Sequence, residues 1–286
     1  MEHVYNKLLL ATEHSENDAG AEALALALAR RCGLPLNAVL PIVSNPEYEA
    51  LAPELAAHAE AQARTRLAAL AEAAQRGGVA LALHARRGPE PYREIVDEAL
   101  SLAADLIVIR RRGRRGLLAN LLVGEMVRNV VTHAPCSVLV VPRAARMWAR
   151  RVLVAVDPVM TDMTPVSTAA AIAAQCSVPL SALSVLGDAA DTVALADHAL
   201  QRAASTALAY GVGLDAQMCS GRPHEQIMAA ARAQGADLLV IGRRGDESLA
   251  HAWLGGVAQK VIGLADLPVL VAVSHVPSSS TTAIPS

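Results

Sequence analysis

The chain has 286 residues with 25 basic and 27 acidic side chains, so its formal charge is -2. The hydrophobic fraction of 53% excludes an intrinsically disordered protein, and the length predicts two domains of roughly 150 residues each. The near-zero charge gives no support to a nucleic-acid or membrane-surface binder, and no apolar run approaches the ~18 residues of a transmembrane helix.

Short apolar runs alternate with longer Ala-rich stretches along the first part of the chain. The run 8–11 predicts a strand, and the stretch 18–31 predicts a helix because its apolar residues recur at spacings of three and four. The runs 104–109 and 137–141 predict two later strands. Near-continuous apolar strands that alternate with helices are typical of a parallel sheet covered by helices on both faces.

The same order of elements then repeats in the second part of the chain. The matching segments are 7–13 and 151–157, 34–36 and 178–180, 104–109 and 236–241, and 137–141 and 268–272. The offset between partners falls from 144 positions in the first pairs to 131 in the last. We therefore expect extra residues in the first copy, around 45–58.

The duplication predicts two tandem Rossmann-like α/β domains, each an open five-stranded parallel sheet with about four helices on its two faces. We place the first domain at residues 1–146, the second at 147–275 and a disordered tail at 276–286.

One loop of the second copy has the composition of an anion site. The strand 238–241 runs into Gly242-Arg243-Arg244-Gly245, and nine residues later the pair Gly255-Gly256 opens the next helix. Glycines let backbone amides approach a phosphate closely, and a helix N-terminus offers unpaired N–H groups and the positive end of its dipole. We expect at least one of the two arginines to face the anion.

At these residues the chain resembles the universal stress protein family. Nucleotide-binding members of that family carry G-x2-G-x9-G-[ST] after the fourth strand and an Asp at the end of the first. Gly242, Gly245 and Gly255 stand at the family's spacing, and Asp157 stands in the Asp position. The resemblance covers nearly the whole chain as two tandem domains. In single-domain members the last strand often pairs across a dimer, so the resemblance implies that 137–142 and 268–273 pair here and that the two copies form an intramolecular pseudo-dimer.

The resemblance implies an adenine nucleotide in the second copy, either ATP or AMP, with or without Mg²⁺. Asp157 would accept a hydrogen bond at the adenosine end, and the base pocket would be lined by Ala155, Val156 and Val185, with Ile241 beside it. The phosphates would be held by the backbone amides of Gly242, Arg244, Gly245, Gly255, Gly256 and Val257.

The two copies depart from the family pattern to different degrees. In the second copy the Ser/Thr position is Gly256, and the loss of one hydrogen bond worth about 0.5–1.5 kcal/mol predicts several-fold weaker affinity. In the first copy Arg110 replaces the first glycine, Glu125 replaces the Ser/Thr, and Glu13 replaces the Asp. A carboxylate at a phosphate position repels the ligand, so we expect a degenerate site there.

Simpler interpretations of these features stay open. The glycines of the second copy could make only a tight strand-to-helix turn, and Asp157, which precedes a proline, could cap a turn. The arginine-rich segment 110–115 could bind phosphate, nucleic acid or a lipid headgroup. The near-zero net charge instead favours a solvated loop balanced by acids elsewhere.

Cysteine and histidine spacings give no indication of a metal site. None of the four cysteines forms a C-x-x-C pair, and no H-x-x-x-H or H-E-x-x-H spacing occurs, so we expect small buried thiols. Cys32 and Cys176, which share the offset of the duplication, are expected to fill the core near the ends of the first helices. A P-loop, a dinucleotide fingerprint and a hydrolase nucleophile elbow are also absent.

The leading functional hypothesis is therefore a cytoplasmic universal-stress-type protein in which a nucleotide regulates a protective interaction with an unknown protein partner. Cytoplasm is the default because the N-terminus lacks a basic start and a long apolar centre. The alternative is a nucleotide-independent interaction protein or small-molecule carrier of the same fold. An ATPase or phosphotransferase is a weaker third option, because no nucleophile or general base emerges. The sequence leaves open whether the chain also forms a homodimer.

Overall fold

The computed structural model describes residues 3–44, 53–111, 124–159, 161–186, 192–243 and 254–274. In chain order the described elements of the first half are β1 (Leu8–Ala11), α1 (Ala19–Cys32), β2 (Leu36–Val43), α3 (Pro53–Arg76), β3 (Leu81–Gly88), α4 (Pro91–Ser101), β4 (Leu106–Arg110), α5 (Glu125–His133) and β5 (Ser137–Val141). Those of the second half are β6 (Val152–Val156), α6 (Thr164–Cys176), β7 (Leu180–Leu186), α7 (Thr192–Ala209), β8 (Leu214–Ser220), α8 (Pro223–Ala233), β9 (Leu238–Gly242), α9 (Gly256–Leu264) and β10 (Val269–Ala272).

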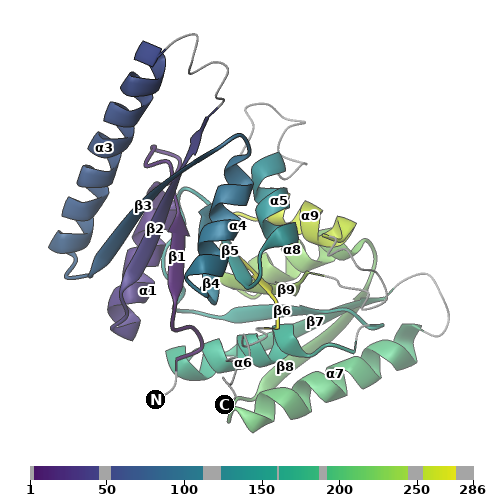
Figure 1. Ribbon diagram of the computed structural model, residues 1–286. Helices are drawn as coiled ribbons and strands as arrows, with labels where there is room; N and C mark the ends of the chain where they lie inside the picture. Colours follow the sequence, from purple (N-terminus) through teal and green to yellow (C-terminus); the bar gives the residue numbers. More distant parts are fainter. Residues whose placement is uncertain are drawn as a thin grey trace, which may run out of the picture.

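The described strands form one ten-stranded sheet of order β3-β2-β1-β4-β5-β10-β9-β6-β7-β8 (Figure 1). Within each half all neighbouring strands are parallel. The halves meet at β5 and β10, which are antiparallel with Leu139 opposite Leu270. The predicted pairing of 137–142 with 268–273 is therefore confirmed, as are the five-stranded parallel sheets of the α/β fold.

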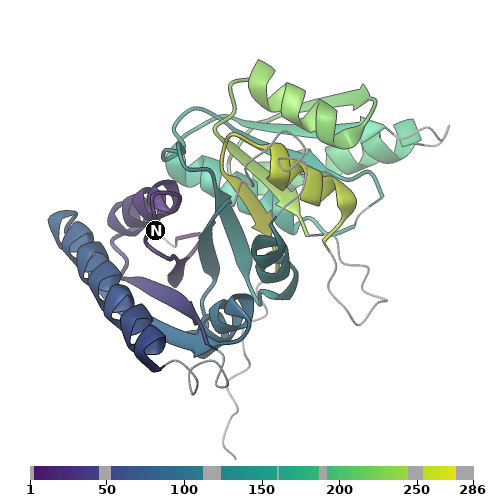
Figure 2. The same ribbon diagram turned by 90° about the horizontal axis from the view of Figure 1, so that it is seen from above.

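Helices cover both faces of this sheet (Figure 2). One apolar core lies under α1, α3, α6 and α7 and contains the alternate strand residues Leu8, Leu10, Val152 and Val154. The other lies under α4, α5, α8 and α9 and contains residues of opposite parity, such as Leu9 and Leu153. Strands buried on both faces explain why the sequence shows continuous apolar runs instead of alternation.

The duplication is least regular in the second crossover of each half. Helix α3 has 24 residues, whereas its counterpart α7 has 18. Part of the predicted insertion, 53–58, is therefore the beginning of α3, while 45–52 lies outside the described residues. The predicted tail, 276–286, also lies outside the described residues, which end at 274.

The cysteines differ in burial more than predicted. Cys136 is fully buried between α5 and β5, as expected for a core thiol. Cys32, Cys176 and Cys219 are only partly buried. The expectation of core filler therefore holds in part for Cys176, which packs against the edge of the apolar core, and less for Cys32 at the end of α1.

Two further observations concern the described residues as a whole. Among them, no helix combines the length and the apolar composition that crossing a membrane requires. Nor do they contain a cluster of three or more His, Cys, Asp or Glu side chains placed to hold a metal ion.

Candidate functional site

The candidate site lies where the strand order of the second half reverses. Strand β6 pairs with β7 on one side and with β9 on the other, and all three run parallel. Helix α6, which follows β6, packs on one face of the sheet, and α9, which follows β9, packs on the other. The carboxyl ends of β6 and β9 therefore lie at the position where open α/β sheets usually bind a ligand, and we call this position the crevice.

The residues expected to line a base pocket lie at these strand ends. Ala155, Val185 and Ile241 belong to the core under α8 and α9, so their side chains share one face of the sheet. Ala155 is half-buried, whereas Val185 and Ile241 are 8% and 5% exposed. Val156 packs its side chain into the opposite core, under α6. Only its backbone can therefore contribute to a pocket formed by the other three.

Asp157 follows β6 directly and closes a turn. Its Oδ1 accepts a hydrogen bond of 3.1 Å from the backbone N–H of Val159, two residues on. This is the turn-capping role that the sequence left open for it.

Two glycines frame the other side of the crevice. Gly242 ends β9, and a Cβ built there would lie 3.3 Å from the Pro165 Cγ of α6. Gly255 precedes α9, and the N-terminus of that helix has no side-chain cap. Gly256 is exposed, with open space where its Cβ would be, and Val257 is 36% exposed. Among the described residues, no side chain therefore caps the first turn of α9. Arg244 and Gly245 lie outside the described residues.

Arg243 lies differently from the sequence-based expectation. Its guanidinium crosses to the first half, where Nη1 donates to the Ala134 carbonyl at 2.7 Å and lies 3.3 Å from that of Thr132. Burial lowers the pKa of this arginine. The charge of Arg243 thus lies at the C-terminal end of α5. The prediction that at least one of the two arginines faces the anion now concerns Arg244, which lies outside the described residues.

The equivalent crevice of the first half is filled by Arg110. This residue takes the place of Gly242 and is only 3% exposed. Its Nη1 donates to Ser15 Oγ at 2.6 Å and to Asp18 Oδ2 at 2.9 Å, and its Nη2 donates to Glu13 Oε2 at 2.8 Å. Asp18 is 1% exposed, so the pair is a buried one.

The space left beside this ion pair is about 10 Å³, lined by Ala11, Thr12, Glu13, Asp18, Pro41, Ile95, Arg110 and Met126. That is scarcely room for one water molecule. Sequence reasoning attributed the degenerate site to a repelling carboxylate at Glu125, but that side chain is 82% exposed. The side chain of Arg110 fills this position instead, and it is held by Asp18, an acid that the sequence analysis did not single out.

The arginine-rich segment is accordingly not a solvated loop at its beginning. Arg110 is buried, and Arg111 donates from Nη1 to the Gly263 carbonyl of α9 at 2.8 Å. The remaining arginines, Arg112, Arg114 and Arg115, lie outside the described residues. The burial of Arg110 and the packing of Arg111 had a signal in the sequence, because the two residues directly continue a buried apolar strand.

The sequence model of the universal stress protein family matches residues 4–142 and again residues 149–273. The chain belongs to the universal stress protein family. Two matches in one chain make it a tandem member of that family. Each match spans five strands and the crevice between the first and fourth of them.

Individual universal stress proteins agree with this assignment. One from Synechocystis sp. is 30% identical over 152 residues, which are 48% of this chain and 97% of that protein. One from Methanocaldococcus jannaschii is 38% identical over 74 residues, 26% of this chain and 44% of that protein. The crystal structure of one from Archaeoglobus fulgidus has the same fold, with a TM-score of 0.71, 19% identity and coverage of 93% of this chain and 97% of that one.

Proposed function

We propose that the second half binds an adenine nucleotide, ATP or AMP, and that this binding regulates a protective role of the protein in stress. The base would lie against Ala155, Val185 and Ile241, and the phosphates would lie at the start of α9. Support comes from the position of these residues around one crevice and from the family to which the chain belongs.

The observation that carries the proposal is the contrast between Gly242 and Arg110. These residues end the equivalent strands β9 and β4. In the first half the side chain of Arg110 fills the crevice and forms an ion pair with Glu13, the acid that follows the first strand. In the second half residue 242 has no side chain, so this plug is lacking and the amides of α9 can approach a phosphate.

The contrast also defines the experiment. In the Gly242→Arg variant a guanidinium would stand where Arg110 stands in the first half, with Asp157 and Asp162 at the positions of Glu13 and Asp18. A Cβ at residue 242 would lie 3.3 Å from the Pro165 Cγ, a contact that a shift of a few tenths of an ångström relieves. We expect isothermal titration of ATP with Mg²⁺ to give saturable heat with the wild type and at least a tenfold weaker affinity with Gly242→Arg.

Gly213→Arg is the matched control. Gly213 is exposed, and a Cβ at this position meets no atom within 4 Å, so this variant adds the same charge at a distant site. It should bind ATP as the wild type does. Absence of heat from the wild type at millimolar ATP would refute the proposal, and equal affinity of wild type and Gly242→Arg would place the nucleotide elsewhere. Mass spectrometry of freshly purified, denatured protein would identify a nucleotide carried through purification.

A further inference from the structure

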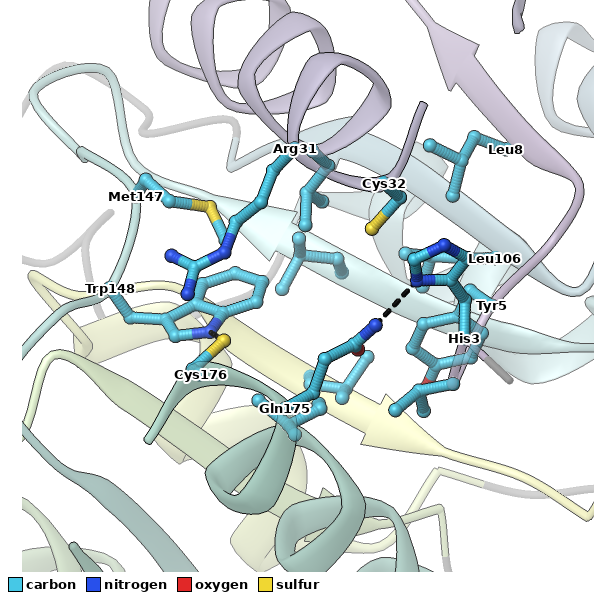
Figure 3. Close-up of a pocket in the computed structure, with 15 residues that line it drawn as sticks. His3, Tyr5, Leu8, Arg31, Cys32, Leu106, Met147, Trp148, Gln175 and Cys176 are labelled. Atoms are coloured by element: carbon cyan, nitrogen blue, oxygen red, sulfur yellow. Dashed lines mark hydrogen bonds between the residues drawn. The ribbon is translucent and has the colours of Figure 1, made fainter. Parts of the chain in front are cut away.

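A cavity of about 150 Å³ lies between the two halves, on the face of the sheet opposite the candidate nucleotide site (Figure 3). Its floor is formed where β5 and β10 pair, at Leu139 and Leu270. The C-terminal ends of α1 and α6 form its walls and bring Cys32 and Cys176 to it. The cavity thus lies at the pseudo-symmetry axis of the molecule, where neither half alone could form it.

The two halves differ in the residues that they contribute to this cavity, and one difference is large in side-chain volume. Trp148 stands 144 positions after Val4, the offset that also relates Cys176 to Cys32. Trp148 is 4% exposed and its Nε1 donates to the Cys176 sulfur at 3.3 Å. Beside Cys32 the first half has the small Val4 instead of an indole ring, so packing is incomplete on that side.

Hydrogen bonds confirm that the two positions are structurally equivalent. The backbone N–H groups of Asn6 and Lys7 donate to Asp105, and those of Arg150 and Arg151 donate to Asp237. The two acids occupy the same place before the fourth strand of each half. The segments that precede the first strands therefore run alike, and the contrast of Val4 with Trp148 is one of side-chain volume.

The wall of the cavity is apolar but carries one unpaired hydroxyl. Tyr5 lines it, and the Tyr5 hydroxyl oxygen is buried without a hydrogen-bond partner of ordinary geometry among the described residues. Burial raises the pKa of this hydroxyl, and a contact with the Ser137 side chain lowers it by a smaller amount. The Ser137 hydroxyl itself accepts a hydrogen bond from the Val273 N–H at 3.2 Å, so it does not form a bond of ordinary geometry with Tyr5. The Tyr5 hydroxyl is therefore a neutral donor, and leaving it unpaired is costly.

The remaining polar groups are at the edge. Gln175 Nε2 donates to His3 Nδ1, and both side chains are only half-buried. Arg31 is exposed, so the charged member of the lining keeps its contact with solvent. Figure 3 shows Met147 and Trp148 at one end and His3 and Tyr5 at the other. An ionised ligand would lose its hydration without gaining a buried countercharge, which favours an uncharged one.

We propose that this cavity is a binding site for an uncharged single-ring aromatic molecule that carries a hydrogen-bonding oxygen, of the phenol class. A cavity of about this volume lined by aliphatic and aromatic side chains accommodates a benzene ring. The ring packs between Trp148 and the leucines, and its oxygen accepts a hydrogen bond from Tyr5. The site does not depend on the nucleotide proposal, since it involves the other face of the sheet.

The test is calorimetric titration with p-cresol and with toluene, which has the same ring and methyl group but no hydroxyl. The wild type binds p-cresol about 2–10-fold more tightly than toluene, the ratio that one net hydrogen bond gives. Tyr5→Phe abolishes this preference while toluene still binds. Val4→Trp, which adds to the first half the ring that the second half has, abolishes binding of both.

Val193→Trp is the matched control, because Val193 is 54% exposed on α7 and the same substitution there leaves the cavity unchanged. It binds both probes as the wild type does. The proposal is overturned if p-cresol gives no heat at millimolar concentration, if Val4→Trp binds as well as the wild type, or if Tyr5→Phe keeps the preference for p-cresol. Should Val4→Trp fail to fold, Tyr5→Phe decides alone.

Discussion

Arg111 and Arg243 each donate a hydrogen bond to the C-terminal end of a helix in the opposite half. They are equivalent residues, 132 positions apart, and each follows the fourth strand of its own half. Arg111 donates to the carbonyl of Gly263 in α9 at 2.8 Å, and Arg243 donates to that of Ala134 after α5 at 2.7 Å. The two contacts form a reciprocal pair across the junction of β5 and β10. Each places a cation at the negative end of a helix dipole.

Replacing Arg243 with Met should lower the stability of the protein without weakening nucleotide binding. A hydrogen bond that involves a charged group contributes about 1.5–3 kcal/mol, so the free energy of unfolding should fall by that amount in urea titrations. Because the guanidinium lies on α5, ATP affinity should stay within about twofold of the wild type. A large loss of affinity with unchanged stability would mean that Arg243 binds the phosphate instead.

Arg110→Met should be among the most destabilising substitutions in the first half. It leaves the buried Asp18 carboxylate without its partner, and breaking a buried ion pair in this way costs about 3–5 kcal/mol. The control is Arg143→Met, which breaks the exposed pair with Glu16 and should cost no more than about 1 kcal/mol. The double variant Arg110→Met with Asp18→Asn should recover part of the lost stability, because the uncompensated buried charge is then gone. Equal losses of stability in Arg110→Met and Arg143→Met would contradict the buried role of Arg110.

Gly256→Ser should tighten nucleotide binding. The substitution restores the hydroxyl of the family motif at the first residue of α9, where a side chain meets no other atom within 4 Å. One added neutral hydrogen bond predicts an affinity about 2–10-fold higher in calorimetry. Gly213→Ser serves as the control for a serine at an open position. A loss of affinity in Gly256→Ser would show that the phosphate does not approach this residue.

Cys136 should make the protein less stable at alkaline pH. Burial raises the pKa of its thiol to about 12, whereas in the unfolded chain the thiol ionises near its ordinary pKa of about 8.5. Between these values only the unfolded state loses the proton, so the free energy of unfolding falls as pH rises. Below about pH 7 the thiol is protonated in both states and adds no pH dependence.

Urea unfolding between pH 8 and 10.5 measures this effect. Relative to the wild type, Cys136→Ala should lose stability less steeply above about pH 9, by up to about 1.4 kcal/mol per pH unit. Cys219→Ala, which removes a partly buried thiol, is the comparison and should change the slope less. Parallel pH curves for the wild type and Cys136→Ala would contradict the raised pKa.

The sequence by itself determined the duplicated α/β fold and the position of the crevice, while the pairing of the last strands was implied by the resemblance to the family. These follow from local patterns: apolar runs form β6 and β9, Gly242 ends β9, and Gly255 precedes α9. Each pattern is read from residues that are neighbours in the chain, and the repeat placed the elements in the same order twice. Strand direction then brings the carboxyl ends together by a general rule of open sheets.

The tertiary structure alone decided which way the arginines point and where space is left. The contacts of Arg110 with Glu13 and Asp18 join residues 97 and 92 positions apart, and that of Arg243 with Ala134 spans 109. No local pattern contains such distances, because they depend on which strands lie side by side. The cavity beside Val4 has the same origin: it depends on how two copies with different side chains pack against each other across β5 and β10.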